Sequence, residues 1–145
     1  MRIDRLHGVT SPRLAVVDVD ATLHAAAISL SKPGIGLAVV CHGDSCVVGV
    51  LSKADLVRHL ASSGRPEASV AELMSRPVVS CRPGDDLHEV WQMMTAQNLE
   101  NVPVLDADLR PLGILNIRDA MKVLFEEEEF LEHALVNYIS GVGYQ

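Results

Sequence analysis

Gly49-Val50-Leu51-Ser52-Lys53-Ala54-Asp55 and Gly113-Ile114-Leu115-Asn116-Ile117-Arg118-Asp119 are two copies of one seven-residue pattern, 64 residues apart. Each copy has a glycine, two apolar residues, a short polar residue, two further residues and an aspartate. Sliding the sequence against itself by this distance aligns residues 36–60 with residues 100–124 without a gap, and six of the 25 pairs are identical. The repeat indicates two copies of one supersecondary unit.

The two units share one predicted order of elements. The same offset pairs Leu23-His24 with Leu87-His88, and a two-residue difference upstream brings Val16-Val17 onto Val78-Val79. Helices are predicted to begin near Ala21 and Asp86, and again at Ser52 and Asn116. Apolar and β-branched runs predict strands over residues 14–19, 37–41 and 46–51 of the first unit and over 78–81, 102–105 and 112–115 of the second.

This order predicts an α/β (α+β) fold, made of two β-α-β-β-α repeats packed with pseudo-two-fold symmetry. A unit of about 60 residues cannot close a stable core alone, so the two should share one. The expected divisions are an N-terminal extension (1–13), the first repeat (14–62), a linker (63–69), the second repeat (70–125) and a helical extension with a tail (126–145). The last helix is expected to run from Ile117 to about Ile139.

Composition restricts the kinds of partner. The net charge of −7, with no cluster of Lys or Arg, disfavours nucleic acid, and only 3% of residues are aromatic. No run approaches the roughly 18 apolar residues of a membrane span, and no signal peptide is evident. We therefore expect a cytoplasmic protein without a membrane partner, in which the three cysteines are reduced.

The paired segments quoted above resemble the signature of CBS domains, and residues 101–106 resemble the strand that precedes it. The resemblance extends from about residue 14 to residue 124. It implies a stand-alone tandem CBS-domain protein of bacterial type, in which two repeats form a Bateman module. Such modules have two clefts that often accept AMP, ATP, NAD or S-adenosyl compounds.

The resemblance also implies which residues contact the ligand. An aspartate one turn into a helix accepts hydrogen bonds from the ribose hydroxyls, and the preceding Ser52 or Asn116 faces phosphate with the helix N-terminus. For the cleft containing Asp119 the candidates are Val79, Ser80, Cys81, Asn101, Val102, Pro103, Val104, Asn116, Arg118 and Asp119. For the other cleft they are Ala38, Val39, Ser52 and Asp55. Both aspartate motifs are also typical helix starts, and the two roles are compatible.

Charge ranks the two clefts. Glu100 stands where many nucleotide-binding relatives carry an arginine, and a carboxylate there repels phosphate. Arg118 supplies a positive charge beside Asp119, so the Asp119 cleft is expected to bind better than the Asp55 cleft.

Two functions remain open at this stage. The first is a non-catalytic regulatory module that binds an adenine nucleotide and signals to a separate protein effector; Arg118 and Asp119 favour it. The alternative, favoured by Glu100, is a protein-interaction or scaffold module with empty clefts. An enzyme ranks third because no nucleophile and base pair emerges.

Metal and oligomeric state can also be predicted. Cys41, His42 and Cys46 supply at most three ligands, so no metal site and no obligatory cofactor are expected. A homodimer is expected, because the last helix and the helix over residues 87–94 offer more apolar surface than one module can cover.

Overall fold

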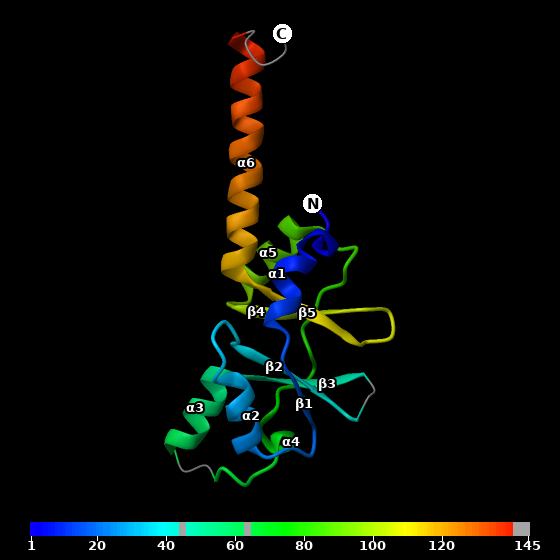
Figure 1. Cartoon of the computed structure of the whole chain (residues 1–145), viewed down its shortest axis with the longest axis vertical. Helices are drawn as coiled ribbons and strands as arrows, with labels where there is room; N and C mark the ends of the chain where they lie inside the picture. The colour runs from blue at the N-terminus through cyan, green and yellow to red at the C-terminus, as the bar shows by residue number, and fades with distance from the viewer. Residues whose placement is uncertain (44–45, 63–64, 141–145) are drawn as a thin grey trace.

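The computed structural model describes residues 1–43, 46–62 and 65–140, with only the backbone described at 130, 131, 134 and 137–140. The predicted tail at 141–145 and two residues of the predicted linker, 63 and 64, lie outside this description. The chain forms two lobes, and the last helix projects away from one of them (Figure 1).

The first lobe contains a three-stranded sheet in the order β1-β2-β3. β1 runs parallel to β2, and β2 runs antiparallel to β3. The elements of the first repeat are β1 (Val16–Asp18), α2 (Leu23–Leu30), β2 (Leu37–Cys41), β3 (Val47–Ser52) and α3 (Lys53–Ser62). β2 is buried along its whole length, as expected of a central strand.

The second lobe contains the antiparallel pair β4-β5. The second half of the chain forms α4 (Val70–Leu73), α5 (Leu87–Ala96), β4 (Asn101–Leu105), β5 (Pro111–Asn116) and α6 (Ile117–Ser140). The strand predicted over residues 78–81 is reduced to a single parallel bridge between Cys81 and Val104. The mixed α and β architecture with two matching repeats agrees with the prediction.

The 64-residue offset holds without interruption, so the predicted two-residue shift is wrong. Val17 pairs with Val40 in β2, and Cys81 pairs with Val104 in β4. Cys81 is therefore the counterpart of Val17, whereas the sequence comparison had aligned Val16-Val17 with Val78-Val79. A chance match of two Val-Val dipeptides misled that alignment.

The helix caps obey the same offset. The Thr22 hydroxyl accepts a hydrogen bond from the Ala25 N–H (3.1 Å), and the Asp86 carboxylate accepts one from the Glu89 N–H (3.1 Å). These contacts start α2 and α5 at equivalent positions.

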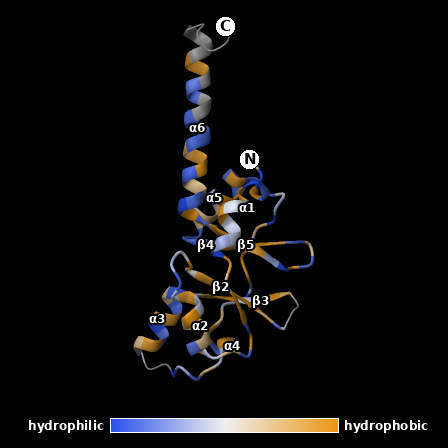
Figure 2. Cartoon of the chain, viewed as in Figure 1, coloured by the Kyte–Doolittle hydropathy of each residue, from blue (hydrophilic) through white to orange (hydrophobic). Residues whose placement is uncertain are grey.

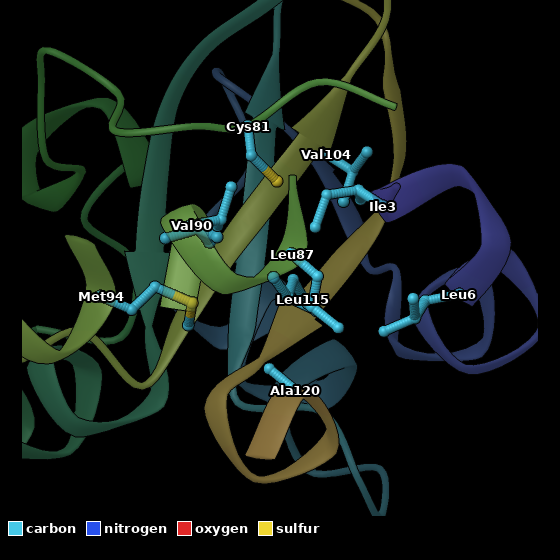
Figure 3. Packing of buried hydrophobic residues seen from close by; sticks show 10 residues of the cluster. Ile3, Leu6, Cys81, Leu87, Val90, Met94, Val104, Leu115 and Ala120 are labelled. Carbon is cyan, nitrogen blue, oxygen red and sulfur yellow. The ribbon is translucent and has the colours of Figure 1, made fainter. Parts of the chain in front are cut away.

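The first residues of the chain pack in the second lobe. They form η1 (Ile3–Leu6), α1 (His7–Thr10) and η2 (Ser11–Arg13). Ile3 and Leu6 are buried in one cluster with Leu87 and Leu115, and Figure 3 shows these side chains converging between the N-terminal turns and α5. Val70, 64 residues after Leu6, is fully buried in the core of the first lobe. Each repeat thus sends its leading segment into the other lobe.

Two glycines mark where these crossing segments pass. A Cβ placed on Gly113 would lie 2.7 Å from the Thr10 carbonyl carbon, and one on Gly49 would lie 2.6 Å from Met74 Sδ. Thr10 and Met74 are themselves 64 residues apart. Residues 1–13, predicted as an extension, are therefore the structural counterpart of residues 65–77, and the crossing is reciprocal, as two-fold symmetry requires.

A third buried cluster joins the two sheets. It contains Leu37 and Val39 of β2 together with Leu105 and Ile114 of the second lobe. In Figure 2 the strands are mostly coloured hydrophobic, while α6 alternates between hydrophobic and hydrophilic residues along its length. Leu37 of this cluster and Val50, which packs against it, also line the larger of the two spaces described below.

Candidate functional site

A cleft of about 870 Å³ lies between the two lobes. It is bounded by the start of α3, by residues 98–103 at the start of β4, and by the segment that leads from α4 into the second lobe. The last of these segments is one of the two that cross between the lobes, and the walls come from both repeats, so the cleft exists only where the two repeats meet.

The walls of this cleft are largely apolar. They include Val50, Pro77, Val79, Leu99 and Pro103. Val79 is 38% exposed although it is surrounded by these residues, so it presents free hydrophobic surface to the cleft. Walls of this kind suit a flat, weakly polar ring such as a purine base.

One carboxylate stands at the helix start that borders the cleft. Asp55 lies in the first turn of α3, and its N–H donates to the Ser52 hydroxyl (3.0 Å), so Ser52 caps the helix as expected. The Asp55 carboxylate accepts one hydrogen bond from Arg58 Nη1 (2.9 Å), and the two side chains are 38% and 74% exposed. An exposed pair within one helix is weak, which leaves this carboxylate available to a ligand.

The equivalent carboxylate in the second repeat is already occupied. Arg13 Nε donates to Asp119 Oδ2 (2.5 Å) and Arg13 Nη2 donates to Asp119 Oδ1 (3.1 Å). Both side chains are half-buried, at 29% and 22% exposure. A two-pronged guanidinium contact of this kind is among the stronger ion pairs.

A small polar pocket of about 260 Å³ lies beside this pair. Its walls include Arg13, Asn116 and Arg118. Asn116 is fixed by two contacts: its Oδ1 accepts from the Arg118 N–H (2.9 Å), and its Nδ2 donates to Asn101 Oδ1 (2.9 Å).

The large cleft and the small pocket share part of their lining. Gly36, Lys53, Glu100 and Asn101 border both. A group that leaves the large cleft at this point meets the cations of Lys53 and Arg118 and the anion of Glu100. The junction is therefore polar and mixed in charge, whereas the large cleft is apolar.

The structure divides the predicted site residues between three places. Val79, Asn101 and Pro103 line the large cleft together with Ser52 and Asp55, and not with Asp119 as predicted. Asn116 and Arg118 line the small pocket. Ser80 is exposed but borders neither space, and the remaining candidates are buried in the hydrophobic clusters, namely Ala38, Val39, Cys81, Val102 and Val104.

The predicted ranking of the clefts also differs from the structure. The open space lies at Asp55, and the carboxylate of Asp119 is engaged by an arginine 106 residues away in the sequence. Arg118 provides a cation near Asp119, as expected, but local sequence could not show that Arg13 reaches the same carboxylate.

Several residues of the site were missed. Pro77 and Asn98 line the open cleft, and their counterparts 64 residues earlier are Arg13 and Gly34. Gly34 and Asn98 both have positive φ, +81° and +54°, so the two turns match. Extending the 64-residue comparison into residues 1–13 would have found these positions.

The cysteines take no part in either space. Cys81 is 2% exposed, and burial raises the pKa of its thiol to about 12. Burial also raises the pKa of the Cys41 thiol. Within residues 1–43, 46–62 and 65–140, no three His, Cys, Asp or Glu side chains are grouped so that they could hold a metal ion.

Comparison with known proteins identifies the repeat. The family model for the CBS domain matches this chain twice, over residues 6–62 and over residues 70–126. The matched segments begin 64 residues apart, and the first includes most of the N-terminal turns that cross into the second lobe.

Two solved structures have the same arrangement. A CBS-domain containing protein from Agrobacterium tumefaciens is 28% identical, with a TM-score of 0.73 over 85% of this chain and 98% of the other. A CBS domain protein from Pyrobaculum aerophilum, complexed with AMP, is 25% identical, with a TM-score of 0.73 over 82% of this chain and 89% of the other.

The chain spans half or less of the curated relatives that it matches first. One of them is arabinose 5-phosphate isomerase KdsD of Salmonella typhi, 25% identical over 114 residues, which make up 78% of this chain and 34% of the isomerase. In the described part of this chain, no helix combines the length and apolar character that crossing a membrane requires.

Proposed function

This chain belongs to the CBS-domain family, and we propose that it is a non-catalytic, cytoplasmic regulatory module that binds an adenine nucleotide in the Asp55 cleft. Occupancy of the cleft is passed on to a separate effector protein. The observation that carries the proposal is the cleft itself: about 870 Å³ of largely apolar space with the weakly paired carboxylate of Asp55 at its wall. Ligand clefts in proteins commonly have volumes of about 300–1,000 Å³.

The residues of the cleft fit the parts of a nucleoside. Val79 and Pro103 offer apolar surface to the adenine ring. Asp55 accepts hydrogen bonds from the two ribose hydroxyls, in exchange for its single contact with Arg58. That exchange costs little, because exposed ion pairs of this type contribute about 0.2–1 kcal/mol.

The phosphate of the ligand points to the junction shared by the cleft and the small pocket. Lys53 and Arg118 provide two cations there, and Glu100 provides one opposing carboxylate. The two cations outnumber the one carboxylate, which favours a phosphate at this junction, and we take AMP, with its single phosphate, as the leading ligand. The AMP complex of the Pyrobaculum relative supports this choice.

Calorimetric titration with AMP, ATP, NAD and S-adenosylmethionine tests the proposal. Hydrogen bonds to a charged group contribute about 1.5–3 kcal/mol, so Asp55→Ala should weaken AMP binding by roughly 10- to 150-fold. Asp119→Ala is the matched control, since it removes the equivalent carboxylate from the closed side. AMP affinity that is unaffected by Asp55→Ala overturns the site assignment.

The phosphate contact has its own test. Lys53→Ala and Arg118→Ala should weaken AMP binding and leave adenosine binding nearly unchanged, because adenosine lacks the group that meets those cations. Lys32→Ala removes an exposed lysine from outside both spaces and serves as the control. An equal loss of affinity for adenosine and AMP contradicts the proposed direction of the phosphate.

Glu100 favours one other function. Its carboxylate borders both spaces and opposes any phosphate that reaches them. If neither adenosine nor any of the four nucleotides and S-adenosyl compounds named above binds, the chain is a scaffold module rather than a nucleotide sensor. The cleft is then a contact surface for another protein.

A homodimer through α6 completes the proposal. Met121, Phe125, Leu135 and Val136 are 50–67% exposed and fall within about 100° of the helix circumference. The apolar face of α5, also expected to serve as an interface, is covered by the core of its own lobe. The side chain of Leu131, another expected contact, lies outside the described residues.

Light scattering tests the dimer. We expect a mass of twice 15.7 kDa at micromolar concentration. Leu135→Lys should shift the protein toward the monomer, whereas His133→Lys adds the same charge outside the exposed apolar stripe and should not. A monomeric wild-type protein contradicts the proposal.

A further inference from the structure

Arg13 occupies the second cleft in the way a ligand would. Three of its donors are used: Nε and Nη2 on the Asp119 carboxylate, and Nη1 on the Gly34 carbonyl oxygen (2.7 Å). Gly34 has a φ of +81°, and a Cβ at Gly34 would lie 3.6 Å from Arg13 Nη1, so the arginine passes close to this turn. The guanidinium is thus held on one side by Asp119 of α6 and on the other by the turn at Gly34.

The other repeat shows what this position looks like when it is not filled. Pro77 is 64 residues after Arg13 and lines the open cleft near Asp55. A proline ring has no charge and cannot reach or bind that carboxylate. The two sides therefore differ by an arginine in place of a proline, and they leave about 260 Å³ and about 870 Å³ respectively.

We propose that Arg13 is a built-in occupant of a second nucleotide cleft, so that the wild-type chain binds one nucleotide and acquires a second site only when Arg13 leaves Asp119. This rests on the proposed function for the nature of the ligand. The latent site takes a nucleoside whose ribose hydroxyls replace the guanidinium on Asp119. Its apolar wall includes Ile35, which borders the small pocket and is the counterpart of Leu99 in the open cleft.

Competition with Arg13 sets the affinity of the latent site. If Arg13 is away from Asp119 in between one in ten and one in a hundred molecules, the apparent dissociation constant there is weakened about 10- to 100-fold. Anything that draws the N-terminal turns away from the second lobe, such as an acidic partner that binds Arg13, would open the site. Binding of such a partner to the segment around Arg13 would therefore raise the number of nucleotides that one chain can bind.

Calorimetric titration with AMP measures the number of sites directly. We expect about one site per chain in the wild type and about two in Arg13→Ala, the added site being the latent one. Arg13→Ala with Asp119→Ala should return to about one site, because the carboxylate of the latent cleft is then missing. Arg65→Ala removes an exposed arginine of the linker and is the matched control, with the number of sites unchanged.

The design separates this inference from the function on which it rests. Asp55→Ala should lose the only wild-type site, and Arg13→Ala combined with Asp55→Ala should bind about one AMP through the latent site alone. If the wild type binds no AMP, the proposed function of the Asp55 cleft fails, and the double variant still reports on the latent site. An Arg13→Ala protein with one site of unchanged affinity overturns the inference.

A measurement without nucleotide tests the contact itself. A double-mutant cycle of Arg13→Ala and Asp119→Ala, followed by urea unfolding, should show coupling of about 5- to 30-fold in the unfolding equilibrium constant. Arg13→Lys keeps the charge but loses the two-pronged geometry, so it should retain only part of that coupling. Additive single effects would mean that Arg13 does not hold Asp119, and the inference would fall.

Discussion

The first repeat leaves Asp55 paired only with an exposed arginine three residues along its own helix, whereas in the second repeat Asp119 is held by Arg13 from 106 residues away. The backbone around the two carboxylates is similar: a polar residue caps each helix start, the turns at Gly34 and Asn98 match, and the crossing segments are equivalent. The difference lies in one side chain of the crossing segment. Two copies of one unit can therefore keep the same fold and still differ in whether their cleft is open to a ligand, because of one residue outside the repeated motif.

The largest difference we expect between the repeats is in how much stability each loses when a methyl group is added at the glycine that both repeats contain. Gly113→Ala would bring a Cβ to 2.8 Å from the Thr10 carbonyl oxygen, which is backbone and cannot easily yield. Overpacking typically costs 1–3 kcal/mol, so we expect about 3 kcal/mol of the free energy of unfolding to be lost. Gly49→Ala meets mainly the flexible end of Met74 and should cost about 1 kcal/mol.

Urea unfolding of the two variants measures this difference. Gly8→Ala is the control, because its Cβ would meet nothing within 4 Å, and in a helical turn it should stabilise the protein by up to about 1 kcal/mol. Equal losses at Gly49 and Gly113 would show that the crossing of residues 1–13 is no more rigid than that of residues 65–77.

The next largest difference concerns the two aspartates in the absence of ligand. Asp119→Ala leaves Arg13 half-buried without its carboxylate, and we expect a loss of about 1–1.5 kcal/mol, reduced from the value for a fully buried partner because both side chains are partly exposed. Asp55→Ala breaks an exposed pair and should change stability by less than about 0.5 kcal/mol. Thermal and urea unfolding at low salt give both values. A larger effect at Asp55 would reverse the comparison.

The helix caps should differ in their dependence on pH rather than in their location. The N–H of Glu89 lowers the pKa of Asp86 below its ordinary 3.8, so the carboxylate form stabilises α5. That stability is present above pH 3.8 and is lost as the pH falls through the lower pKa of the folded state.

The Thr22 hydroxyl does not titrate, so Thr22→Ala should cost about 1 kcal/mol at any pH, whereas the effect of Asp86→Ala should vanish in acid. Unfolding at pH 7 and in acid distinguishes them, and an acid-resistant effect of Asp86→Ala would contradict this account.

The smallest expected effect is at Cys81, the counterpart of Val17. Its thiol is buried and its pKa is raised to about 12, so it fills space rather than reacting. Cys81→Val should change the free energy of unfolding by less than about 1 kcal/mol, as a swap of similar volume does, and should leave AMP affinity unchanged. Calorimetric titration of this variant with AMP checks the conclusion that Cys81 does not contact the ligand. A clear loss of AMP affinity would show that Cys81 belongs to the binding site after all.

The sequence predicts the repeat, the element order and the helix starts because these depend on local patterns. Gly49 and Gly113, with the polar residue three positions later, are visible in any comparison of the sequence with itself. The strand predicted over residues 78–81 does not form, because the β-branched residues 78 and 79 do not pair and, within this segment, one residue, Cys81, bridges to β4.

The site was harder to predict than the fold, since it depends on contacts across the molecule. Thr10 and Met74, like Arg13 and Pro77, share no chemical character, so their equivalence follows from the 64-residue offset alone and not from any similarity of the residues. The sequence predicts Arg118 as the cation beside Asp119 because the two residues are adjacent in the chain. In the structure, Arg13 forms the ion pair with that carboxylate. Only the packing of residues 1–13 against β5 reveals this.

The passage of Thr10 against Gly113 also has a consequence for biosynthesis. Thr10 is made 103 residues before the glycine on which it packs, and at 5–20 residues per second this delay is about 5–20 s. During that time Ile3 and Leu6 have no core to enter, and Arg13 has no carboxylate to hold. Residues 1–13 are thus among the last to find their place although they are made before the rest of the two repeats, and the second cleft is closed only when translation has reached Asp119.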